Sequence, residues 1–231
     1  MKVSVVIPNN GRDISATRQV IGRMADVELI EIDLGRERSI QRNIGISQAK
    51  GKYIFILDSD QVPTRYLIEE CVAIMDDNPR CVGVYIPEII IGDDWFSKLR
   101  NFERQFYTGT CIDCVRFVRA DNCPAFDELQ NGTEDSDFDL RIRGQKLVSS
   151  NPLYHFDNIE IGEYFRKKNY YAKSLRRFSE RNPNAKILNF WYRCVQVYIE
   201  NGKWKKLLRH PIAALMLVGL LIIRGIIYVK R

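Results

Sequence analysis

The sequence has few of the residues that build zinc sites and disulfide scaffolds. Its 231 residues include only two histidines, and the six cysteines are spread along the chain. Cys111 and Cys114 form a single CxxC pattern without a second pair at ligand spacing, which argues against a structural zinc site. Glycine-rich phosphate loops are also missing, because neither GxGxxG nor a Walker lysine follows any candidate strand. These absences argue against dinucleotide oxidoreductases and P-loop NTPases.

Acidic residues are scarce in the C-terminal third of the chain. Residues 161–231 contain 3 acidic and 16 basic side chains, whereas residues 1–160 contain 26 acidic and 19 basic ones. An acidic body followed by a basic tail favours metal or cation chemistry in the body and contact with an anionic surface in the tail. On charge alone, that surface could be nucleic acid or phospholipid.

The hydropathy of the tail favours phospholipid over nucleic acid. Residues 211–223 carry no charge, and residues 211–229 would span about 28 Å as a helix, close to the ~30 Å of a bilayer core. We expect a hydrophobic membrane helix here that crosses the bilayer once or lies in one leaflet. Arg224, near its carboxyl end, is expected to reach the interface. A nucleic-acid-binding protein would leave this uncharged run unexplained.

Basic and aromatic residues precede this hydrophobic segment. The basic residues around Trp204 are Lys203, Lys205, Lys206 and Arg209. This pattern suits anionic headgroups on the cytoplasmic side of a cell membrane, and residues 187–199 are predicted to form a further interfacial helix. The alternative is that both segments are buried core helices of a soluble protein. Because Met1 and Lys2 lead into a predicted strand without a signal peptide, we expect the body to stay in the cytoplasm.

The first half of the chain alternates between short apolar runs and longer mixed stretches. The apolar runs are Val3–Pro8, Val27–Leu34, Tyr53–Leu57 and Val82–Ile86. Strands separated by helix-length segments predict an α/β fold with a mainly parallel central sheet. Ligands bind at the carboxyl ends of the strands in such sheets. Candidate site residues therefore follow the runs, with Asn10, Asp33, Asp58 and Asp60 among them.

Asp58 and Asp60 form an Asp-x-Asp motif directly after one of these runs. Two carboxylates at the edge of the sheet could coordinate Mg²⁺ or Mn²⁺ bound to a diphosphate. An isolated Asp-x-Asp is a weak motif, however. Turn aspartates that cap a helix starting near Thr64 explain it equally well.

Three blocks of sequence add specificity when they are taken together. They are VSVVIP (Val3–Pro8), RNIGISQAKGKYIFILDSD (Arg42–Asp60) and RADNCPAFDELQNGTEDSDFDLRIRG (Arg119–Gly144). In this order they resemble family 2 glycosyltransferases of the GT-A fold, which is Rossmann-like, over roughly residues 3–180. The resemblance implies inverting transfer of a sugar from a nucleotide-sugar donor. A divalent cation would stabilise the leaving diphosphate, and a carboxylate would take the proton of the acceptor hydroxyl.

The resemblance also implies roles for individual residues. It puts Pro8 and Asp33 at the nucleotide base, Asp58 and Asp60 at the diphosphate and its metal, and Asp135 at the position of the catalytic base. These assignments are expectations of the family pattern. They make Mn²⁺ or Mg²⁺ the expected cofactor.

Further residues are expected in the same donor site. Asn10 and Glu134 belong to it by position, and Arg38 and Arg42 could contact the donor phosphates. A solvated helix face explains the two arginines equally well. For the acidic pair that follows Thr133, the alternative is an N-cap with two acids favoured in the first helical turn.

Three later residues are weaker candidates. The Thr-Glu-Asp block resembles the cellulose-synthase-like branch, whose later Gln-x-x-Arg-Trp is matched here by residues 174–178 with the Gln and Trp replaced. We expect Arg177 to contact the diphosphate and the Phe178 ring to stack on the acceptor. The alternative is that this segment is a basic amphipathic helix that lies on the membrane. This departure argues against processive synthesis.

By the same resemblance His155, after a predicted strand over 152–154, is a third metal ligand, although a lone histidine is more often structural.

These features predict three segments. Residues 1–160 form the catalytic domain, residues 161–210 amphipathic interfacial helices and residues 211–229 the membrane helix. A membrane tether favours a lipid-linked acceptor. The acceptor group is either a sugar hydroxyl, which requires a base, or a polyprenyl phosphate, which requires none. The chain also resembles archaeal mannosyltransferases of lipid-linked N-glycan assembly, which makes GDP-mannose the expected donor and UDP-sugars the next choice.

Two other classes of protein fit parts of the sequence. A nucleotidyltransferase would share the nucleotide-binding sheet but usually opens with a glycine-rich loop, which is missing here. A non-catalytic membrane scaffold would tolerate the loss of Asp135.

Overall fold

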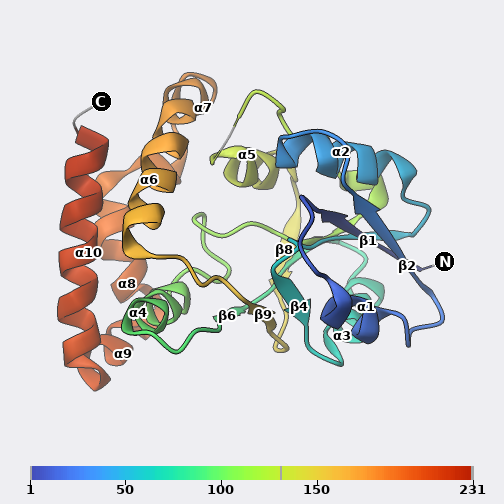
Figure 1. Ribbon diagram of the computed structural model, residues 1–231, viewed down its shortest axis with the longest axis horizontal. Coiled ribbons are helices and arrows are strands. Elements are labelled where there is room, and N and C mark those ends of the chain that lie inside the picture. The colour runs from blue at the N-terminus through green and yellow to red at the C-terminus, as the bar shows by residue number, and fades with distance from the viewer. Residues whose placement is uncertain (1, 131, 230–231) are drawn as a thin grey trace.

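The computed structural model describes residues 2–130 and 132–229. An α/β body carries the N-terminus, and a helical C-terminal part lies at the opposite end of the molecule (Figure 1). The strands are β1 (Val3–Pro8), β2 (Val27–Ile32), β3 (Tyr53–Ile56), β4 (Gln61–Pro63), β5 (Cys81–Tyr85), β6 (Glu88–Ile90), β7 (Phe117–Arg119), β8 (Gln145–Val148) and β9 (Leu153–His155). The helices are α1 (Ser15–Ile21), α2 (Arg38–Gln48), α3 (Leu67–Asp77), α4 (Trp95–Arg104), α5 (Glu134–Arg141), α6 (Ile161–Tyr171), α7 (Leu175–Arg181), α8 (Val197–Ile199), α9 (Trp204–Arg209) and α10 (Pro211–Val229).

The central sheet is mixed but mainly parallel. Across the described part of the chain its strand order is β2-β1-β3-β7-β5-β8, and β7 alone runs antiparallel to its neighbours. A smaller sheet has the order β4-β9-β6. The prediction of an α/β fold with a mainly parallel sheet is confirmed, with one reversed strand that the sequence did not indicate.

The two faces of the central sheet bury alternate residues of its strands. Val3, Val5 and Ile7 of β1 pack with apolar side chains of α1 and α3. Val6 lies on the other face, in a cluster with Phe138 of α5. Figure 1 shows α2 and α5 on this second side of the sheet. Helices thus cover both faces, as buried parallel strands require.

The boundaries of β2, β3 and β5 differ from the predictions by one or two residues. β2 ends at Ile32 rather than Leu34, because Leu34 is exposed and the chain turns at Gly35, whose φ of 93° favours glycine. The helix expected near Thr64 is α3, which begins at Leu67.

The predicted interfacial helix over 187–199 takes a different form. A 3₁₀ turn at Lys186–Leu188 comes first. A helix over 190–199 follows, in which the π-helical stretch Tyr192–Gln196 continues directly into α8. Tyr192 is buried in a second hydrophobic core that also contains residues of α4, α6 and α10, whereas Trp191 is exposed. The segment is therefore partly a core element and partly an apolar surface.

The helix predicted over 211–229 is present as α10, with the predicted bounds. Leu217 and Leu220 are buried in the second core. Judged over the residues described, no helix combines the length and the apolar character needed to cross a bilayer.

Arg224 does not reach outward from α10 as expected. Its guanidinium forms a bidentate ion pair with Glu103 of α4, with Nη1–Oε1 and Nη2–Oε2 distances of 2.5 and 2.6 Å. Burial raises the pKa of the Glu103 carboxyl, but the Arg224 charge and its hydrogen bonds outweigh this and lower the pKa to about 2. The expectation was wrong because a buried carboxylate 121 positions earlier offers Arg224 a partner inside the protein.

We expect Arg224→Met to destabilise the protein by about 3 kcal/mol, because it leaves the Glu103 carboxylate buried without a counter-charge. The free energy of unfolding in denaturant measures this. The double variant Glu103→Gln/Arg224→Met should lose clearly less free energy of unfolding, because it leaves no unpaired charge at this position. Arg176→Met, which breaks an exposed pair with Glu180, is the matched control and should cost less than about 1 kcal/mol. Equal losses in the single and double variants would contradict the role of the pair.

Candidate active site

A cavity of about 550 Å³ lies at the carboxyl ends of β1 and β3. The predicted site residues that line it are Pro8, Asn10, Arg38, Asp58, Asp60 and Glu134. They come from two strand ends and from the first turns of α2 and α5, so the fold brings together residues that are up to 126 positions apart. Asp33 does not line this first cavity, because it is exposed in the turn after β2.

Basic side chains surround the first cavity. Arg12, Arg36 and Arg38 line it from the α/β body, and Arg166 and Lys167 line it from α6. Several cations around one cavity can neutralise the phosphates of a ligand without a glycine-rich loop. The two residues of α6 were not among the predicted site residues, since their only signal was the basic character of the tail.

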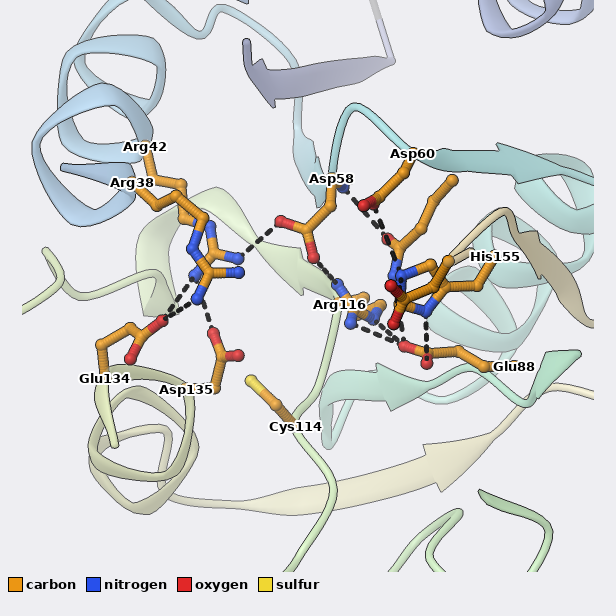
Figure 2. Close-up of polar contacts among 12 residues, drawn as sticks. Arg38, Arg42, Asp58, Asp60, Glu88, Cys114, Arg116, Glu134, Asp135 and His155 are labelled. Carbon is orange, nitrogen blue, oxygen red and sulfur yellow. Dashed lines mark hydrogen bonds and ion pairs between the residues drawn. The ribbon is translucent and has the colours of Figure 1, made fainter. Parts of the chain in front are cut away.

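Arg42 is the most deeply buried of the predicted site residues, with a side chain that is 0% exposed. Its Nη2 donates to Asp58 Oδ1 and its Nη1 donates to Asp135 Oδ1, both at 2.7 Å. The Phe126 ring lies 4.9 Å from the guanidinium carbon (Figure 2 shows Arg42 between the two carboxylates). Contrary to the expectation, Arg42 therefore does not reach the first cavity to contact phosphates. It is a positioning residue for two carboxylates.

The charge of Arg42 also fixes the ionisation of Asp58. Burial raises the pKa of the Asp58 carboxyl, but Arg42 and Arg116 outweigh this and hold the pKa well below its usual range. Asp58 is thus an anion in the absence of any metal.

Arg38 lies one helical turn before Arg42 and is 40% exposed. Its Nη2 lies 3.1 Å from Glu134 Oε1 and 3.4 Å from the Tyr171 hydroxyl oxygen. Burial and the neighbouring Asp135 charge raise the pKa of Glu134. Arg38 can therefore face a ligand in the first cavity while it also pairs with Glu134.

Asp135 occupies the first turn of α5, and its side chain is 42% exposed. Thr133 does not cap this helix with its side chain, because its hydroxyl donates to Gln130 Oε1 at 2.8 Å. The N-cap interpretation is therefore wrong in its side-chain part, although Glu134 and Asp135 do lie in the first turn. An exposed carboxylate near a helix N-terminus is available to a substrate.

The three predicted metal ligands do not converge on one point. Nowhere in residues 2–130 and 132–229 do three His, Cys, Asp or Glu side chains form a cluster that could hold a metal. Asp60 Oδ1 and His155 Nε2 lie 3.5 Å apart, whereas Asp58 is paired with Arg42 and lies 3.6 Å from Arg116. A diphosphate-bound Mg²⁺ or Mn²⁺ needs only one or two protein ligands, which Asp60 and a deprotonated His155 could supply. Asp58 is already engaged by Arg42 and Arg116.

A buried charge network supports His155 and Asp58. Glu88 of β6 lies 3.4 Å from His155 Nδ1 and accepts from Arg116 Nη2 at 2.6 Å (Figure 2). Burial lowers the pKa of His155, but Asp60 and Glu88 outweigh this and raise it to about 9. At neutral pH His155 is therefore protonated and paired with both carboxylates. A metal ion would have to replace the proton on Nε2, and Glu88 would then orient the ring. Glu88 and Arg116 were not among the predicted site residues, because neither belongs to a recognisable motif.

Arg177 and Phe178 lie away from the first cavity. Arg177 Nε is 3.3 Å from Asp127 Oδ2, which also pairs with Arg181. Phe178 is 1% exposed and lines a second cavity, together with Asp135. The expected diphosphate contact of Arg177 is therefore not supported by its position, because Asp127 draws the side chain toward the loop before α5.

The model of the family described as glycosyl transferase family 2 matches residues 2–128 of this chain. That match covers more than half of the sequence, including β1, the Asp-x-Asp motif and α2. The chain belongs to glycosyl transferase family 2. The expectation of a glycosyltransferase is thereby confirmed. No curated protein matches the sequence.

Solved structures of TarS from S. aureus resemble this glycosyltransferase in fold. TarS shows a TM-score of 0.50 at 16% identity over 75% of this chain. TarS 1–349 in complex with UDP-GlcNAc shows a TM-score of 0.51 at 16% identity over 74% of this chain. This chain covers 39% of the first TarS chain and 66% of the second, so it spans less than two thirds of either. The likeness supports an α/β fold of the GT-A type.

We expect Arg42→Met to lower the free energy of unfolding of this glycosyltransferase by about 3–5 kcal/mol. The reason is that Asp58 and Asp135 would lose their shared, fully buried counter-charge. Arg18→Met, which removes a more exposed pair with Glu31, is the control and should cost about 1 kcal/mol or less. Denaturant unfolding of both variants checks this, and similar losses would show that Arg42 has no special role.

Proposed function

We propose that this family 2 glycosyltransferase transfers a sugar from a nucleoside diphosphate sugar to an acceptor hydroxyl with inversion at the anomeric carbon. The observation that carries the proposal is the Arg42 bridge. It connects Asp58, at the cavity lined by basic residues, with Asp135, a partly exposed carboxylate on the first turn of a helix. A donor-side anion and a candidate base are thus fixed relative to each other.

The first cavity is the proposed donor site. Its basic rim of Arg12, Arg36, Arg38, Arg166 and Lys167 suits a diphosphate. We propose GDP-mannose as the donor, on the resemblance to archaeal mannosyltransferases. UDP-sugars are the second choice, supported by the TarS 1–349 complex, in which the ligand of that protein is UDP-GlcNAc.

We propose that Asp60 and His155 hold Mn²⁺ or Mg²⁺ together with the donor diphosphate. Bound there, the ion would offset the charge on the leaving diphosphate. Glu88 then keeps His155 oriented, with its Nε2 toward Asp60. Arg12, whose Nη1 lies 2.9 Å from Asp60 Oδ2, would share the same phosphates.

Asp135 is the proposed general base. Its carboxylate would accept the proton of the acceptor hydroxyl while the hydroxyl oxygen attacks the anomeric carbon from the face opposite the diphosphate. Attack from that face inverts the anomeric configuration. Arg42 fixes the carboxylate through one oxygen, Oδ1, and leaves Oδ2 for the proton. An acceptor phosphate, which is already an anion, would not need this base, so Asp135 favours a hydroxyl acceptor over a polyprenyl phosphate.

We propose that the enzyme works at the cytoplasmic face of a cell membrane on a lipid-linked saccharide. Exposed apolar side chains in the C-terminal part support this. They are Phe190, Trp191, Trp204, Leu208, Ile212, Leu215 and Ile222. Basic residues of α9, Lys205, Lys206 and Arg209, lie between them in the sequence. Apolar side chains beside cations suit an interfacial position on anionic lipid.

We expect Asp135→Asn to bind the donor as the wild type does but to abolish transfer, because the amide cannot accept the proton. Thermal stabilisation by a panel of nucleotides and nucleotide sugars, with Mn²⁺ or with EDTA, measures binding. Release of nucleoside diphosphate in the presence of membrane lipid extract measures transfer.

Asp77→Asn, an exposed aspartate at the end of α3, is the control and should leave both measurements unchanged. Stabilisation that does not depend on metal would remove Asp60 and His155 from the proposed ion site. Transfer at the wild-type rate by Asp135→Asn would contradict the role of Asp135 as base.

We expect Leu215→Glu to weaken binding to anionic phospholipid vesicles by roughly tenfold or more. Burial of one leucine contributes about 1.5–3 kcal/mol, and the Leu215 side chain is 74% exposed on α10. Co-sedimentation with vesicles measures binding. Leu34→Glu, at a site that is 67% exposed in the α/β body, is the matched control. Equal binding of both variants would contradict a membrane contact through α10.

A further inference from the structure

Three cavities meet along one side of α6. The second cavity, of about 180 Å³, and a third, of about 300 Å³, share Gly132, Asp135, Lys168 and Tyr171 as wall residues. Tyr171 also lines the first cavity. The proposed base therefore lines two cavities that adjoin the proposed donor site.

The backbone at Gly132 brings these walls close together. Its φ is +100°, and a Cβ atom there would lie 2.3 Å from Tyr171 Cβ, well inside van der Waals contact. Only glycine allows α6 to approach the N-terminus of α5 so closely. This contact sets Lys168, one turn before Tyr171, beside the second and third cavities.

Lys168 differs from the other cations near the third cavity. Arg224 pairs with Glu103, and Arg100 Nη1 lies 2.6 Å from Asp157 Oδ2. Within residues 2–130 and 132–229, no carboxylate oxygen lies within 4.0 Å of the Lys168 ammonium. Burial and the charges of Arg224, Arg100 and Arg193 lower the pKa of Lys168 to about 7, against the opposing effect of Glu103.

The second cavity is amphipathic. Its apolar wall is formed by Leu175, Phe178, Ile187 and Leu188. Its charged wall residues are Lys168 and Arg193, with Asp135 as the acidic one. Because Arg42 already pairs with Asp135 at 2.7 Å, the charge of that carboxylate is largely compensated from behind. The cavity thus presents a cationic wall to a ligand that sits next to the base.

We propose that Lys168 and Arg193 form an anion-binding acceptor subsite beside Asp135, which takes a phosphate or carboxylate group carried by the acceptor next to an apolar portion. This inference rests on the proposed function, in which Asp135 is the base, and it narrows the acceptor to anionic amphiphiles.

The electrostatics of the subsite support an anionic ligand. Arg224 and Arg100 are already paired with carboxylates, whereas the partly buried Lys168 ammonium is unfavourable until an anion supplies a counter-charge. The anion would gain charge-assisted hydrogen bonds from Lys168 and Arg193. The reacting hydroxyl of the same acceptor would then lie near Asp135, with the apolar portion against Phe178 and its neighbours.

The test is calorimetric titration of the full chain with inorganic phosphate, hexyl phosphate and hexyl glucoside, each with and without saturating nucleoside diphosphate and Mn²⁺. We expect hexyl phosphate to bind when the first cavity is filled, and hexyl glucoside to bind at least tenfold more weakly. Lys168→Met should weaken hexyl phosphate binding by about tenfold or more, the loss expected for one charge-assisted hydrogen bond. Lys168→Arg should restore most of it.

Lys50→Met, an exposed lysine after α2, is the matched control and should bind like the wild type. Tighter binding of hexyl phosphate than of inorganic phosphate supports the subsite and indicates that its natural anion is carried by a lipid-like molecule. Equal binding of hexyl phosphate and inorganic phosphate also supports the subsite, and indicates that its natural anion is a phosphate that is not attached to a lipid. Unchanged hexyl phosphate binding in Lys168→Met, with or without nucleotide, overturns the subsite. Failure of every nucleotide to bind the wild type would instead overturn the proposed donor site.

Discussion

Arg42 is a guanidinium without exposed side-chain surface that contacts carboxylates from two distant parts of the chain. Asp58 follows β3, Asp135 begins α5, and each lies 2.7 Å from a different nitrogen of Arg42. Arg42 is fully buried and Asp58 is largely buried, whereas Asp135 is partly exposed, so loss of Arg42 would leave Asp58 without its closest counter-charge in a buried position. The distance between the donor side and the acceptor side of the proposed site is therefore fixed before any ligand arrives.

A second, largely buried network also holds residues of the Asp-x-Asp motif. Glu88 connects Arg116, which faces Asp58, with His155, which faces Asp60. Both halves of the Asp-x-Asp motif are thus held by opposite charges from other strands. Such preorganised charges are suited to a reaction in which negative charge builds up on a leaving diphosphate.

The helical C-terminal part contributes to the site as well as to the surface. α6 begins after the predicted end of the catalytic domain at residue 160, yet Arg166 and Lys167 line the first cavity. α10 is tied to α4 through the Arg224–Glu103 pair, and both residues line the third cavity. In our proposal, one face of this helical part contacts lipid while the other forms the acceptor path. A lipid-linked acceptor would then travel a short distance from the membrane to the base.

Local patterns in the sequence determined much of this protein. The apolar runs predicted β1, β2, β3 and β5 within one or two residues, the Asp-x-Asp and Thr-Glu-Asp blocks indicated the family, and hydropathy predicted the bounds of α10. These features depend on neighbours in the chain, so a pattern can encode them. The tertiary structure alone decided that Arg42 is buried rather than exposed, that Arg224 turns inward, and that Lys168 lies beside Asp135. Each of these depends on a partner many positions away, and the ion pair or cavity that results has no counterpart in local spacing.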